Sequence, residues 1–168
     1  MRRLPLLLIA LSLFTSLIPF PPAMGAAAIN DARALADLKT AKGVFLVDIG
    51  DPKKLAFYLD VIKGTHAGLV RQYVKPDFIL VFIGPSVPFL TTEPDDDVVM
   101  EHEDTLNRIA AAVADLDRLG VRQEICAVAT KVFNVDNEKV LPELDVIGDG
   151  FISLIGYQAQ GYALVPVF

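Results

Sequence analysis

The 168-residue sequence contains one cysteine, two histidines and no tryptophan. A single cysteine excludes an intrachain disulfide framework and a zinc cluster built on cysteines. Basic residues are also few, because 15 lysines and arginines stand against 21 acidic residues and leave a formal net charge of −6. Nucleic-acid binding requires clustered lysine and arginine to neutralise phosphates, so this charge balance argues against it.

Nucleotide- and flavin-binding motifs are missing as well. Neither G-x-x-x-x-G-K-[ST] nor G-x-G-x-x-G occurs in the sequence, which leaves a P-loop or a dinucleotide site without support. The first turn of the predicted sheet, Asp48–Pro52, carries two carboxylates that would repel a flavin phosphate. Both histidines, His66 and His102, fall on or near predicted helices, which gives little support to a Ser-His-Asp triad. We therefore expect no cofactor.

The N-terminal residues 1–25 have the layout of a secretory signal peptide. Two arginines form a short basic region, residues 4–18 are an uncharged apolar run, and prolines and small residues follow. We place the cleavage site after Gly25, with Ala28 as the second choice. An uncleaved anchor is the alternative, but the apolar run is shorter than the about 20 residues that span a bilayer. The sequence therefore predicts a periplasmic or secreted protein without a stable membrane anchor after cleavage.

Apolar and amphipathic segments alternate regularly after the signal peptide. Residues 26–42 are predicted to form an N-terminal arm or a short helix, and residues 43–168 a single domain. The apolar pattern predicts strands over 44–47, 78–83, 121–128, 144–147 and 162–165, helices over 52–68, about 106–116 and 151–160, and at most two helical turns over 136–141. Such alternation forms βαβ units with right-handed crossovers. We therefore predict an α/β fold with a flavodoxin-like, doubly wound, mostly parallel five-stranded sheet and helices on both faces.

Candidate site residues lie at the predicted carboxyl ends of the strands, where doubly wound sheets bind their ligands. The turns that this rule selects cover residues 48–52, 84–88 and 126–130. The candidate binding residues are Gly84, Pro85, Ser86, Ala127, Thr130 and Lys131.

Cys126 is the candidate catalytic residue, because it lies near the carboxyl end of the third predicted strand. Backbone N–H groups at such a turn, with Lys131 five residues on, would favour a nucleophilic thiolate. The alternative is a buried cysteine that packs as a small hydrophobic side chain.

An acidic stretch between residues 93 and 104 is the only compositionally biased segment. Its carboxylates could bind a hard cation, but it lacks the spacing of a calcium loop. A solvated loop whose last acids favour the N-terminus of the next helix is the alternative, and we expect no metal site.

Five short motifs give the sequence a resemblance to a known family. They are Asp51-Pro52, Gly84-Pro85-Ser86-Val87, Gly120-Val121 leading into Cys126, Val135-Asp136 through Leu141-Pro142, and Gln158-Ala159-Gln160-Gly161-Tyr162. In order and spacing, from about Lys42 to Pro166, they resemble the DsrE/DsrF-like family, which includes sulfur-relay proteins. The resemblance implies a cysteine that carries a persulfide, here Cys126, a protein that donates or accepts the sulfur, and a homo-oligomer, often a trimer or hexamer.

Two functions follow as hypotheses. In the first, the protein is a periplasmic sulfur carrier or sulfur-trafficking protein that acts through Cys126. In the second, it is a non-catalytic oligomeric module that binds a small ligand or a partner segment, and the cysteine is only structural. The sequence does not decide whether the protein is an enzyme.

Overall fold

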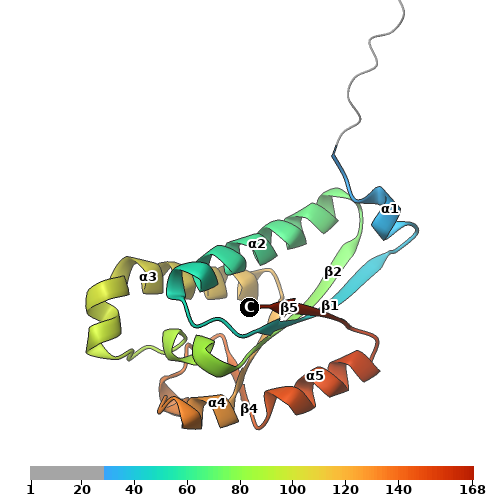
Figure 1. The fold of residues 1–168 in the computed structure, drawn as a ribbon. Coiled ribbons are helices and arrows are strands. Elements are labelled where there is room, and N and C mark those ends of the chain that lie inside the picture. Colours follow the sequence, from blue (N-terminus) through green and yellow to red (C-terminus); the bar gives the residue numbers. More distant parts are fainter. Residues whose placement is uncertain (1–28) are drawn as a thin grey trace, which may run out of the picture. The chain divides into compact units, whose positions relative to one another are not determined.

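Five strands form one all-parallel sheet in the computed structural model, which describes residues 29–168 (Figure 1). The predicted signal peptide lies outside the described residues. The strands are β1 (Thr40–Val47), β2 (Lys75–Phe82), β3 (Arg122–Cys126), β4 (Asp145–Ile147) and β5 (Ala163–Val167), in the order β4-β3-β2-β1-β5. The predicted α/β class, the five strands and the parallel sheet are confirmed. Within residues 29–168, no helix combines the length and apolar character needed to cross a bilayer.

Helices cover both faces of the sheet, as predicted. Figure 1 shows α2 (Pro52–Arg71) and α3 (Asp96–Arg118) on one face and α5 (Gly150–Ala159) on the other. Side chains alternate along a strand, so β1 directs Phe45 into the larger core under α2 and α3 and Val44 into the smaller core under α5. The short helices are α1 (Ala32–Leu35), α4 (Ala127–Val132) and the 3₁₀ turns η1 (Gly84–Phe89) and η2 (Asn137–Lys139).

The order of the strands explains why α5 packs on the face of the sheet opposite α2 and α3. The chain moves outward from β1 to β4 and then returns across the sheet to β5, which pairs with the other side of β1. Because each parallel crossover is right-handed, reversing the direction of travel places the connecting helix on the opposite face. The connection after β4 therefore runs to the face opposite α2 and α3. Ligand crevices of open parallel sheets form where neighbouring connections diverge in this way.

Two predicted boundaries are corrected. The third strand ends at Cys126, because Ala127 and Val128 begin α4 instead of extending the strand. Their apolar character is the same in a strand or a helix, so the pattern could not distinguish the two. The first strand begins at Thr40, because Thr40–Lys42 pair with Lys75–Asp77 through the backbone even though their side chains are mostly exposed.

The acidic stretch is partly helical. Asp96 and Asp97 form the first turn of α3, where their charges favour the helix N-terminus, and the helix is kinked at His102. Upstream, Glu93 pairs with Lys139 at 2.6 Å, which raises the pKa of that lysine. Among residues 29–168, no three or more His, Cys, Asp or Glu side chains are placed to hold a metal ion together.

Candidate functional site

A pocket of about 340 Å³ opens at the carboxyl edge of the sheet. It is formed by the turns after β1, β2 and β3, the three that the sequence selected, together with the start of α5. The described residues that line it are Asp48, Ile83, Gly84, Cys126, Val128, Ala129, Val132, Phe133, Asp149 and Phe151. Most of these side chains are apolar, and the pocket contains one sulfur atom and two carboxylates.

Cys126 is the last residue of β3 and the N-cap of α4. Its side chain is 5 % exposed, so the thiol is buried against the protein but lies in the wall of the pocket. The amide N–H of Gly150 donates a hydrogen bond to Cys126 Sγ across 3.2 Å. The sulfur atom is therefore held in position by the first turn of α5, in the wall of a pocket that a reagent can enter.

Gly150 reaches the sulfur because α5 begins very close to the sheet. A Cβ at Gly150 would lie 2.6 Å from Ile83 Cγ2 and 3.4 Å from Cys126 Cβ, so a side chain there would collide with the strand ends. Asp149 caps the helix by accepting a hydrogen bond from the Phe151 N–H at 2.8 Å. The first amide of a helix has no partner within the helix, which leaves the Gly150 N–H available to the sulfur.

Asp48 also lines the pocket, and its carboxylate packs against Gly84. Gly84 has a φ of +54°, and a Cβ on it would lie 2.2 Å from Asp48 Oδ1, so the carboxylate occupies the space that a side chain would take. The Asp48 N–H bonds the Val167 carbonyl at 3.0 Å, which fixes the backbone of this turn. Gly84 is the one candidate binding residue that lines the pocket.

The other candidates near Gly84 have structural contacts. The hydroxyl of Ser86 is fully buried and donates to the Ile83 carbonyl at 2.6 Å, which closes the first turn of η1. Pro85 packs against Gly50, where a Cβ would lie 3.2 Å from Pro85 Cβ.

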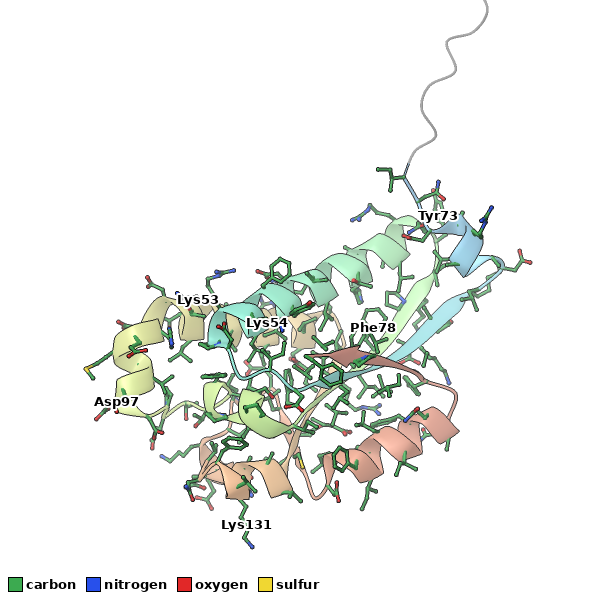
Figure 2. All side chains as sticks on the ribbon, viewed as in Figure 1. Lys53, Lys54, Tyr73, Phe78, Asp97 and Lys131 are labelled. Atoms are coloured by element: carbon green, nitrogen blue, oxygen red, sulfur yellow. The ribbon has the colours of Figure 1, made fainter. Side chains whose placement is uncertain are left out.

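The candidates after Cys126 also lie outside the pocket lining. Ala127 is half-buried and opens α4, and the buried hydroxyl of Thr130 donates to Asn137 Oδ1 at 2.6 Å. Lys131 is exposed and extends from α4 away from the rest of the domain (Figure 2). A direct role in binding for these residues stays a prediction.

The contribution of α5 was missed by the sequence analysis. Asp149, Gly150 and Phe151 come from the connection after β4, which was not among the selected turns. A glycine directly after an aspartate at the start of a helix was the signal available, because the pair combines an N-cap with a close backbone approach.

A second polar contact holds the middle of α5 on the sheet. The Tyr157 hydroxyl donates a short hydrogen bond to Glu124 Oε1, and Arg122 Nη1 donates to that hydroxyl at 3.2 Å. Burial, followed by the bond to Glu124, raises the pKa of Tyr157, and the bond to Tyr157 raises the pKa of Arg122. Glu124 itself is 5 % exposed, and its Oε2 atom has no hydrogen-bond partner among the described residues. This network anchors α5 and does not line the Cys126 pocket.

Fold and pocket together define an α/β domain with one cysteine at the carboxyl edge of a parallel sheet. The model of the DsrE/DsrF-like family matches residues 23–167. The chain therefore belongs to the DsrE/DsrF-like family. A search of curated proteins found no match.

Two solved structures share the fold. The protein of unknown function MTH1491 from Methanobacterium thermoautotrophicum is 18 % identical, with a TM-score of 0.58 over 77 % of this chain and 99 % of that one. The ychN protein from E. coli is 12 % identical, with a TM-score of 0.56 over 75 % of this chain and 98 % of that one. At this level of identity the likeness shows the fold alone.

Proposed function

We propose that the protein is a sulfur carrier in which Cys126 accepts a sulfane sulfur atom and passes it on. The observation that supports this most is the hydrogen bond from Gly150 N–H to Cys126 Sγ inside a pocket. In the proposed step the Cys126 thiolate attacks the outer sulfur of a persulfide R–S–SH. A new S–S bond forms on Cys126, the donor's S–S bond breaks, and R–S⁻ leaves with the electron pair. The proton on the outer sulfur stays with it, so the exchange needs no oxidant or reductant.

Intact-mass spectrometry tests this proposal. After incubation with an alkyl persulfide, we expect a gain of about 32 Da, the mass of one sulfur atom added by persulfidation, and its loss on treatment with a small thiol. Cys126→Ser, which removes the only cysteine, is the matched control and should gain nothing. A wild-type protein that stays at its original mass, and whose folded form resists alkylation at neutral pH, would contradict the proposal.

We further propose that the protein is exported, on the strength of the basic region and apolar run in residues 1–25. Expression of the full chain in a Gram-negative host should give a periplasmic protein whose N-terminus is Ala26. Recovery of an uncleaved chain in the membrane fraction would favour the anchor instead.

A homo-oligomer is part of the proposal. Helix α5 has no charged residue, and Phe151, Ile152 and Ile155 on it are 63–69 % exposed. A helix that is apolar all round is normally covered. Val128 and Val132 on α4 are exposed as well and line the Cys126 pocket, so a second copy packed against α5 would lie beside that site.

A non-catalytic binding module is the second candidate, favoured by the low exposure of Cys126 and the mainly apolar pocket. In that case the folded Cys126→Ser variant would keep its assembly and its biological activity. Loss of activity from a variant with an unchanged melting temperature would exclude this candidate.

A further inference from the structure

The charges around Cys126 are all of one sign. Asp48 and Asp149 are the ionisable lining residues besides the cysteine, and the described lining contains no lysine, arginine or histidine. Lys131, which the sequence offered as a positive charge, extends outward into solvent (Figure 2). A reagent that enters this pocket therefore meets two carboxylates and no lysine, arginine or histidine among the described lining residues.

Neither carboxylate is neutralised by an ion pair within the described part of the chain. Asp149 accepts one hydrogen bond, from the Phe151 N–H, and this bond belongs to the helix cap. Asp48 has no side-chain partner among residues 29–168 and is held in place by its packing over Gly84. Both are half-buried, so their charges act through a medium less polar than bulk water.

These charges set different conditions for different sulfur donors. A thiosulfate or polysulfide anion would have to give up hydration to enter a mostly apolar pocket, and it would be repelled by both carboxylates. The Gly150 N–H, which is hydrogen-bonded to Cys126 Sγ, is already engaged and is not free for an incoming anion. An uncharged persulfide on an apolar carrier loses little hydration and can contact the apolar lining, which includes Val132, Phe133 and Phe151.

We propose that Asp48 and Asp149 act as a charge filter, which keeps free inorganic sulfur anions from Cys126 and admits sulfur presented as an uncharged persulfide on an apolar carrier. The two carboxylates are specificity-determining residues in this scheme and take no part in bond making. The filter rests on the proposed function, because it specifies the donor for the same cysteine.

Paired alkylating reagents measure the filter without any sulfur transfer. Iodoacetamide and iodoacetate deliver similar groups to a thiolate, one neutral and one anionic. We compare the ratio of their rates on folded protein with the ratio on the same protein unfolded in urea. We expect the folded protein to favour iodoacetamide by at least about tenfold more than the unfolded chain does, and we expect the preference to shrink in high salt because salt screens the repulsion.

Single-charge variants assign the effect to the two carboxylates. Asp48→Asn and Asp149→Asn preserve the size of the side chain, and asparagine remains a good N-cap. Each should reduce the preference by about threefold or more. The matched control is Asp37→Asn, which removes the same charge from an exposed position just before β1, at the opposite edge of the sheet, and should leave the preference unchanged. The same variants should also speed sulfur loading from thiosulfate more than they change loading from an alkyl persulfide.

The outcomes separate the filter from the proposed function. A folded-state ratio equal to the unfolded one, or unmoved by both Asp→Asn variants, overturns the filter even if Cys126 still gains sulfur from the persulfide. Failure of Cys126 to react with either alkylating reagent, or with any donor, overturns the sulfur-carrier proposal and the filter together.

Discussion

Gly150 and Cys126 lie 24 residues apart in the chain and are joined by a hydrogen bond from the glycine N–H to the cysteine sulfur. The contact depends on the absence of a side chain at Gly150, because a Cβ would lie 2.6 Å from Ile83 Cγ2. The start of α5 and the end of β3 therefore form one unit, in which helix packing and the environment of the thiol change together.

Gly150→Ala should lower the free energy of unfolding by about 1–3 kcal/mol, the usual cost of overpacking a tight contact. Urea unfolding followed by circular dichroism measures this change. Because the added methyl group pushes α5 away from Cys126 Sγ, the rate at which Cys126 is alkylated should also differ between this variant and the wild type.

Gly156→Ala is the matched control, because it lies in the same helix and a Cβ there would meet nothing within 4 Å. Alanine in place of glycine inside a helix should raise the stability by about 0.5–1 kcal/mol. Equal effects of the two substitutions would show that helix propensity, and not contact with the sheet, governs position 150.

Tyr157→Phe should also destabilise the protein, by about 1–3 kcal/mol, because it removes the donor to a buried carboxylate oxygen. Glu124 would then be left with two unsatisfied oxygens among the described groups, since Oε2 already lacks a partner. Chemical denaturation measures the loss. Adding Glu124→Leu in the Tyr157→Phe background should restore part of it, because an apolar side chain needs no partner. Additive losses in the double variant would contradict the proposed coupling.

The stability should fall in alkaline solution. Burial raises the pKa of Tyr157 above its ordinary value of 10.0, and so does the bond to Glu124. A raised pKa means that the folded state favours the neutral hydroxyl. Its contribution to stability is therefore complete below about pH 10, the value for the unfolded chain, and is lost as the pH rises through the folded-state pKa.

Urea midpoints between pH 8 and pH 11 measure this decline. Tyr157→Phe should make it shallower without abolishing it, because burial and the bond to Asp77 also raise the pKa of Tyr162. A decline of the same slope in the variant would assign the alkaline sensitivity to other groups.

The sequence predicted the sheet well because its central strands are buried on both faces. Val44–Val47 and Phe78–Phe82 are nearly continuous apolar runs, which is what a covered parallel strand requires. It also placed Cys126 correctly at the carboxyl edge of the sheet, because that position follows from strand polarity alone. The end of β3 was less predictable, because Ala127 and Val128 suit a strand or a helix equally.

The α5 part of the pocket could not be predicted from local pattern. The contact between Gly150 and Cys126 exists because the chain reverses direction after β4, and strand order is a property of the whole sheet. The outward course of Lys131 is a similar case, since it depends on the rotation of α4 about its axis. From sequence spacing alone, that lysine was predicted to lie close to the sulfur.

Substitution of Ile155 tests the proposed oligomer. Ile155 is 68 % exposed on α5. Ile155→Lys should therefore leave the stability of the folded single chain nearly unchanged, because surface substitutions usually alter it by no more than about 0.5 kcal/mol. A charge buried against a second copy is costly unless it is paired. The variant should therefore dissociate, which light scattering coupled to size-exclusion chromatography would show as a fall in mass toward the monomer.

Phe57→Lys, at an exposed position on α2 on the opposite face, is the control and should keep the wild-type mass. Dissociation by the control but not by Ile155→Lys would move the interface to α2.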